Sequence, residues 1–176
     1  MTNRIGRRIE GPKAAVRSDP WPLVTDWLLT RPASSRVESV LAVGVSPRPT
    51  LPVDGPVSDV TSLDGAPGGR FDLVVAAGAV ERTARWRRPS GLFTLVEAVA
   101  DGGTLLVVAV AADPTGDPSM IESPRSGAGL RPEELHPLTQ LGLILVSFED
   151  LAPVPGGGSE HRWLRVTYRR FSRDRR

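Results

Sequence analysis

The sequence contains no cysteine and only two histidines, His136 and His161. Without cysteine the chain forms neither disulfides nor thiolate metal sites, and it has no cysteine nucleophile. Two histidines are too few for a histidine-rich metal site, so we expect no metal. No apolar run approaches the roughly 20 residues of a membrane-spanning helix, and the basic N-terminus is not followed by the apolar stretch of a signal peptide. We therefore expect a cytoplasmic protein without membrane contact.

The chain has 176 residues, of which 40% are apolar and 24% charged, and these values are typical of one folded domain. Its net charge of +2 is unevenly distributed. Residues 1–17 carry five basic groups and one acid, and residues 162–176 carry seven and one, so the stretch between them is acidic. We expect a flexible basic arm at residues 1–19, a domain at residues 20–170 and a basic tail at residues 171–176.

Hydrophobic spacing divides the domain into alternating helices and strands. Apolar residues three and four apart predict helices at residues 21–29, 92–100 and 132–141. Short apolar runs predict strands at residues 37–44, 57–60, 71–76, 104–110, 143–148 and 162–169. The glycines of Asp101–Gly103 predict a turn before the strand at residues 104–110. A glycine-rich loop at residues 153–159 predicts a hairpin between the last two strands. This order indicates an α/β fold of three layers.

The order and spacing of five segments resemble a class I S-adenosylmethionine-dependent methyltransferase. Residues 40–48 (VLAVGVSPR) are similar to the first strand and glycine loop of that family, and residues 59–82 to an acidic residue followed by the fourth strand and active-site loop. Residues 95–108 are similar to the helix and fifth strand of the family, and residues 131–151 to its last helix and sixth strand. Residues 163–170 are similar to its antiparallel seventh strand. The resemblance implies a Rossmann-like fold with a mostly parallel sheet and an antiparallel last strand.

The stretch after the first strand departs from the family. Only twelve residues, 45–56, separate that strand from the next, and four of them are proline. A parallel crossover with its helix needs a dozen or more residues, and proline disrupts a helix interior. We therefore expect helix A and the second strand to be shortened or missing. Loss of a helix from one face would expose apolar surface near residues 40–45 and 57–60, which a partner would have to cover.

The resemblance also supplies candidate cofactor residues, and several of them are degenerate. Ala42 stands where the family has an acid, and Ser46 and Arg48 stand at its second and third glycines. A side chain at these glycines would occupy space that the family gives to the methionine part of the cofactor. The cofactor positions that the resemblance assigns are Gly44, Ser46, Asp54, Asp59 and Ala77. Asp54 would replace the ribose-binding carboxylate, and Asp59 matches the acid near the adenine.

Charged residues follow the predicted strand at residues 71–76. Ligands of open α/β sheets bind outside the carboxyl ends of the strands, so Glu81 is a candidate catalytic base. A role at a helix start or in a salt bridge is the simpler explanation of this residue. The densest positive patch of the domain comes next. Its residues, which are candidates for binding a partner or an anionic ligand, are Arg82, Arg85, Trp86, Arg87 and Arg88. A charged surface turn is the alternative explanation.

Together these patterns favour a degenerate methyltransferase-like protein, a pseudoenzyme. It would lack normal S-adenosylmethionine binding, require no cofactor, and act as a non-catalytic partner or regulatory subunit of an enzyme or of a homo-oligomer. One alternative is an S-adenosylmethionine-dependent methyltransferase of small molecules, or an enzyme of the same fold with a non-methylating reaction. A further alternative is a nucleic-acid-associated module, which the acidic domain disfavours.

Overall fold

The computed structural model describes residues 19–31, 37–44, 48–65, 68–112, 129–152 and 161–171. Most of the expected basic arm and tail, Ser46 and the glycine-rich loop at residues 153–159 lie outside the described residues. The expected division into arm, domain and tail therefore stays a prediction. No helix within the described ranges is long and apolar enough to span a membrane.

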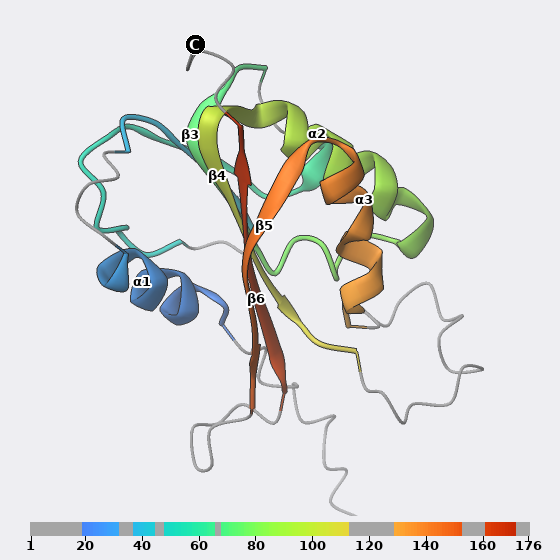
Figure 1. Cartoon of the computed structure of the whole chain (residues 1–176). Helices are drawn as coiled ribbons and strands as arrows, with labels where there is room; N and C mark the ends of the chain where they lie inside the picture. The colour runs from blue at the N-terminus through green and yellow to red at the C-terminus, as the bar shows by residue number, and fades with distance from the viewer. Residues whose placement is uncertain are drawn as a thin grey trace, which may run out of the picture.

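Six strands form one twisted sheet in the order β2-β1-β3-β4-β6-β5 (Figure 1). Neighbours among the first four strands run parallel, whereas β6 runs antiparallel to both β4 and β5. The strands are β1 (Val40–Gly44), β2 (Val57–Val60), β3 (Phe71–Ala77), β4 (Val99–Val110), β5 (Leu143–Leu151) and β6 (Trp163–Arg170). The predicted α/β fold, mostly parallel with an antiparallel last strand, is confirmed.

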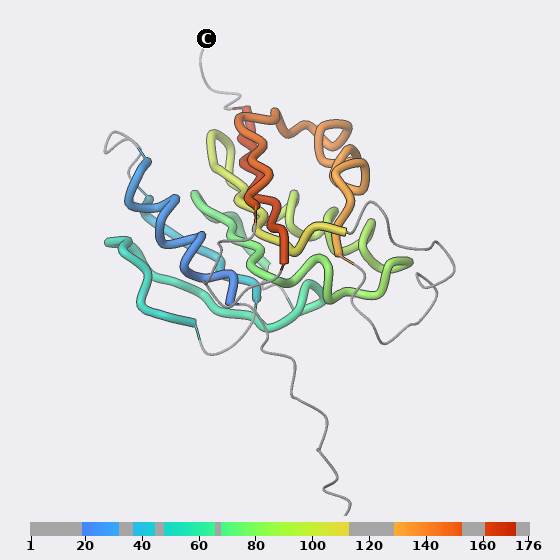
Figure 2. The backbone as a smooth tube through the Cα atoms, turned by 90° about the horizontal axis from the view of Figure 1, so that it is seen from below, coloured from blue at the N-terminus to red at the C-terminus, as the bar shows by residue number. Residues whose placement is uncertain are grey.

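Helices cover both faces of the sheet and create two apolar cores. Helix α1 (Trp21–Thr30) lies on one face, while α2 (Arg88–Ala98) and α3 (His136–Gln140) lie on the other (Figure 1). Figure 2, turned by 90°, shows α1 and α3 on opposite sides of β6. Three short 3₁₀ turns complete the described elements: η1 (Leu63–Gly65), η2 (Arg85–Arg87) and η4 (Pro132–Leu135).

Proline and glycine set several element boundaries differently from the prediction. Helix α2 begins at Arg88, four residues before the predicted start, because Pro89 is favoured in a first helical turn, where its missing N–H costs nothing. The predicted turn at Asp101–Gly103 lies instead inside β4, at an irregularity in its pairing with β3. Gly102 takes a φ of 77°, which favours glycine. A Cβ on Gly103 would lie 3.0 Å from the carbonyl oxygen of Phe71, so β3 passes close to this bulge.

The connection from β1 to β2 contains no helix in its described part, residues 48–56. Figure 2 shows this stretch, cyan on the colour bar, without a helical turn. β2 pairs directly with β1 in parallel, with Val57 opposite Val40. The expectation that helix A and one strand are reduced or missing is confirmed for these residues.

The expectation of exposed apolar surface was wrong for the described residues of β1, which are buried, whereas Val57 and Val60 of β2 are half-buried. Residues 40–43 are at most 2% exposed. Trp21 and Val24 of α1 share an apolar core with Val40 and Ala42 on one face of the sheet. On the other face, Leu63 of η1 packs in the same core as Leu41 and Val43. An N-terminal helix and a single 3₁₀ turn therefore cover the strands that the missing helix would leave bare.

Candidate functional site

The chain order places a candidate ligand site at the carboxyl ends of β1 and β3. From β1 the chain continues outward to β2 and then returns to β3 on the opposite side of β1. Such a reversal of strand order separates the two connecting loops, and ligands of open α/β sheets bind in the crevice that results. Residues that follow these strand ends are therefore the ones that could form a binding site.

Strand packing alone explains two of the candidate cofactor residues. Gly44 is opposite Ala77 in the parallel register, and both residues are buried. A Cβ on Gly44 would overlap the carbonyl oxygen of Ala77 and lie 3.1 Å from its carbonyl carbon. Glycine at position 44 is thus required for β1 to lie beside β3, whether or not a ligand approaches.

Arg48 and Asp59, which the resemblance assigns to the third glycine of the family and to the acid near the adenine, form an ion pair. Arg48 donates from Nε to Oδ1 of Asp59 and from Nη2 to Oδ2 at 2.9 Å. Its Nη1 donates to the carbonyl oxygen of Pro49 at 2.9 Å, which fixes the guanidinium in place. Both oxygens of the Asp59 carboxylate therefore accept a hydrogen bond from Arg48. Asp54 lies exposed in the stretch between the two strands, and Ser46 is outside the described residues.

Glu81 lies buried behind the carboxyl end of β3, with only 6% of the residue exposed. Its Oε1 accepts the backbone N–H of Val110 at 3.3 Å, and its Oε2 has no hydrogen-bond partner among the described residues. Burial raises the pKa of Glu81 to about 6, and the nearby charges of Arg88 and Arg82 oppose that rise only in part. A carboxyl group with such a pKa changes its protonation state close to neutral pH.

Arg88 is a structural residue of the same region. It is 4% exposed, and its Nη1 donates to both carboxylate oxygens of Glu134 at 2.9 Å. It also donates from Nη2 to the carbonyl oxygen of Glu81 at 3.0 Å and from Nε to that of Thr83 at 3.2 Å. Arg88 therefore joins the loop after β3 to the 3₁₀ turn η4, and its guanidinium nitrogens all donate hydrogen bonds within the protein.

Sequence analysis did not identify Glu134, which is the acidic centre of this network. Besides Arg88, its carboxylate accepts the backbone N–H of Arg131 at 2.9 Å and lies 3.3 Å from Nε of Arg85. The signal was present in the sequence, because an acid three residues after the start of a turn commonly accepts an N–H group at that start. Pro132 follows Arg131 and marks the same start.

The rest of the predicted basic patch is spread over the surface at η2. Trp86 is 77% exposed, and the guanidinium of Arg87 lies 4.7 Å from its ring centroid. Arg87 also forms an ion pair with Asp64 at 3.3 Å. Arg85, Arg87 and Arg88 thus each have an acidic partner, and Arg82 lies exposed. The positive charges of three of the four arginines in the patch are therefore balanced by acids, which the sequence did not indicate.

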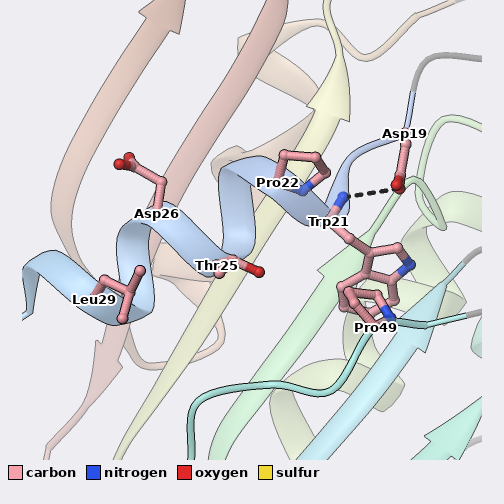
Figure 3. A pocket seen from close by; sticks show the side chains of 7 residues that line it. All are labelled: Asp19, Trp21, Pro22, Thr25, Asp26, Leu29 and Pro49. Atoms are coloured by element: carbon pink, nitrogen blue, oxygen red, sulfur yellow. Dashed lines mark hydrogen bonds between the residues drawn. The ribbon is translucent and has the colours of Figure 1, made fainter.

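A shallow depression of about 450 Å³ lies beside α1 (Figure 3). Its lining residues are Asp19, Trp21, Pro22, Thr25, Asp26, Leu29 and Pro49. Asp19 accepts the backbone N–H of Trp21 at 3.1 Å, and Asp26 is 2.7 Å from Nη1 of Arg165. Both carboxylates therefore hold α1 in place. The described residues contain no group of three or more metal-binding side chains.

The chain has the fold of the class I S-adenosylmethionine-dependent methyltransferases, because solved structures of such enzymes match most of its length. N-methyltransferase NodS from Bradyrhizobium japonicum, solved with S-adenosyl-L-homocysteine, matches with a TM-score of 0.58 and 17% identity, covering 89% of this chain and 94% of NodS. The 1,6-didemethyltoxoflavin-N1-methyltransferase from Burkholderia thailandensis matches with a TM-score of 0.56 and 17% identity over 92% of this chain and 80% of the enzyme.

A third solved structure of this fold is the [4+2]-cyclase SpnF, with a TM-score of 0.55 and 13% identity over 85% of this chain and 80% of SpnF. No protein-family model matches the sequence, and no curated protein sequence matches it either. At these identities the likeness establishes the fold and nothing finer.

Proposed function

We propose that this protein does not bind S-adenosylmethionine in the manner of the enzymes whose fold it has, and that it acts as a non-catalytic binding partner. The observation that carries the proposal is the ion pair between Arg48 and Asp59. It supports the proposal because the resemblance assigns Arg48 to a family glycine and Asp59 to the acid near the adenine, and these two residues bind each other.

The ion pair is one of two obstacles to the cofactor. Asp59 is half-exposed, and a pair at the surface stabilises a protein by about 1 kcal/mol or less, so its free energy alone would not exclude a ligand. The second obstacle is the backbone. Residues 48–56 contain no helix, so this stretch offers no helix N-terminus with free N–H groups for an anionic ligand. Removal of Arg48 would therefore not be sufficient to create a cofactor site.

Calorimetric titration with S-adenosylmethionine and S-adenosyl-L-homocysteine tests the proposal. We expect no binding tighter than about 10 μM, equivalent to roughly −7 kcal/mol, in the wild type or in Arg48→Gly. Arg70→Gly is a matched control, because Arg70 forms an exposed ion pair with Asp101 at 3.1 Å. A dissociation constant of about 10 μM or tighter for the wild type would overturn the proposal. Binding by Arg48→Gly alone would contradict the argument from the backbone.

Glu81 favours a second candidate function, an enzyme that acts on a small molecule. Its buried carboxyl group has a pKa of about 6 and lies at the strand ends where ligands of this fold class bind. A general base with a pKa near the working pH is well suited to proton transfer. The reaction would be methyl transfer or, since SpnF has this fold, a non-methylating reaction. Cofactor-dependent turnover that Glu81→Gln abolishes would support this candidate against the first.

A further inference from the structure

The outer edge of β5 is an open edge of the sheet. β5 is the last strand in the sheet order, and it pairs only with β6 among the described strands. The backbone groups on its other side therefore have no strand partner in the described structure. Exposed strand edges are templates for pairing with another chain, and proteins usually protect them with charged side chains or proline. β5 contains no proline, lysine or arginine, and its two acids, Glu149 and Asp150, are paired with Arg165 and Arg162. Its pairing with β6 is irregular between Leu145 and Ser147.

The side chains of β5 are apolar where they are exposed. Ile144, Leu145, Val146 and Phe148 are between 40% and 61% exposed. Leu145 and Phe148 are opposite Tyr168 and Val166, which belong to the core under α2 and α3, whereas Ile144 is opposite Arg169 on the other face. Apolar surface thus lies on both faces of the edge strand. A partner that covered only one face of β5 would leave the apolar side chains of the other face exposed. A strand added at the edge would extend the sheet and place side chains beside those of β5 on both faces.

We propose that β5 pairs antiparallel with β5 of a second copy, so that one continuous sheet runs through a two-fold symmetric dimer. This inference deepens the proposed role as a binding partner and identifies that partner as the protein itself. A two-fold interface uses the same surface on both copies, so the surface must be complementary to itself. The charges at the two ends of β5 meet this requirement.

The C-terminal end of β5 carries acids and its N-terminal end lies beside arginines. Glu149 and Asp150 are held by Arg165 and Arg162, so these acids do not leave an unbalanced negative charge that would repel a second copy. At the other end, Arg169 of β6 is opposite Ile144 and is exposed, and its Nε donates only to a carbonyl oxygen, that of Gly102, at 3.3 Å. Antiparallel pairing moves the acidic end of one copy toward this arginine of the other.

Two further exposed apolar residues extend the surface at the N-terminal end of β5. Leu141 lies two residues before β5 and is 36% exposed, and Phe171 directly follows β6 and is 69% exposed. A standard interface buries about 800 Å² on each partner, more than four side chains of one strand supply. Strand pairing adds main-chain hydrogen bonds, and Leu141 and Phe171 widen the contact. We therefore expect a reversible dimer that forms at micromolar concentration.

Analytical ultracentrifugation of the full chain between about 1 and 100 μM tests the proposal. The wild type should sediment as a dimer at the upper end, and Val146→Lys with Phe148→Lys should weaken dimerisation at least tenfold. Leu29→Lys with Phe93→Lys is the matched control, because it replaces two exposed apolar residues on α1 and α2. A wild type that stays monomeric at 100 μM overturns the proposal, as does a dimer that the control disrupts and the β5 variant does not.

The absence of cysteine permits a second test that does not depend on loss of binding. Val146→Cys introduces a single thiol on β5, and Leu29→Cys introduces one on α1. Under mild oxidation we expect the first variant to form a disulfide-linked dimer and the second to stay monomeric. Equal crosslinking of both variants, or none with Val146→Cys, overturns the proposal. These results do not depend on the cofactor, so binding of S-adenosyl-L-homocysteine would refute the proposed function and leave the dimer unaffected.

Discussion

Replacement of Arg88 by methionine tests whether the buried network at η4 stabilises the fold. The change removes both hydrogen bonds to Glu134 and leaves the carbonyl oxygens of Glu81 and Thr83 without this donor. Removal of one partner from a buried ion pair costs about 3–5 kcal/mol because the other charge stays behind. Glu134 keeps the N–H of Arg131 and the nearby Arg85, so we expect the lower end, about 3 kcal/mol.

Urea denaturation measures this loss. With a slope of about 2 kcal/mol per molar urea, a destabilisation of about 3 kcal/mol lowers the midpoint by about 1.5 M. Arg87→Met is the matched control. It breaks the half-exposed pair with Asp64 and the contact with Trp86, and should cost about 1 kcal/mol. A double-mutant cycle with Glu134→Gln then isolates the coupling between Arg88 and Glu134. Equal midpoints for Arg88→Met and Arg87→Met would refute the structural role of Arg88.

Three further predictions concern single sites. Because burial raises the pKa of Glu81 from 4.5 to about 6, the folded state retains a proton that the unfolded chain releases. The free energy of unfolding should therefore fall by about 2 kcal/mol in total as the pH rises from well below 4.5 to well above 6. Glu81→Gln should remove this slope, and a slope of opposite sign in the wild type would contradict the assignment. Gly44→Ala should lower the free energy of unfolding by about 1–3 kcal/mol through overpacking against Ala77, and with it the melting temperature; an unchanged melting temperature would contradict the packing argument. Any binding of duplex DNA should be lost near 150 mM salt, and Arg82→Ala with Arg85→Ala should leave its salt dependence unchanged. If duplex DNA still bound at that salt concentration and the two substitutions abolished the binding, the nucleic-acid alternative would be favoured.

The sequence predicted the strands well because burial on both faces leaves a signal within each segment. The continuous apolar runs at residues 71–76 and 104–110 became β3 and the inner part of β4, whose residues 105–109 are fully buried. Helix boundaries were less predictable, since Pro89 allowed α2 to begin one turn earlier than its apolar spacing indicated. The bulge at Asp101–Gly103 depends on how closely β3 passes, which no local pattern records.

The contacts of the candidate site were not predictable from the sequence, because they join residues that are distant along the chain. Arg48 and Asp59 were each identified through the resemblance, but nothing in their spacing indicated that they bind each other. Arg88 was assigned to a surface patch because its neighbours are arginines, and its burial follows from Glu134, 46 residues later. An isolated charge pattern does not distinguish a buried arginine from an exposed one.

The position of β6 between β4 and β5 has a consequence for synthesis of the protein. The ribosome makes β5 before β6, so the apolar side chains of β5 have no neighbouring strand until the last strand emerges. Helix α1 packs its apolar residues Trp21 and Val24 against earlier strands, but it gains two polar contacts only from β6, because Arg165 donates to the carbonyl oxygen of Leu23 and to Asp26. The sheet therefore closes only when β6 inserts, and a nascent chain that stalls before residue 163 leaves the apolar side chains of β5 without that strand, an exposed surface of the kind that chaperones bind.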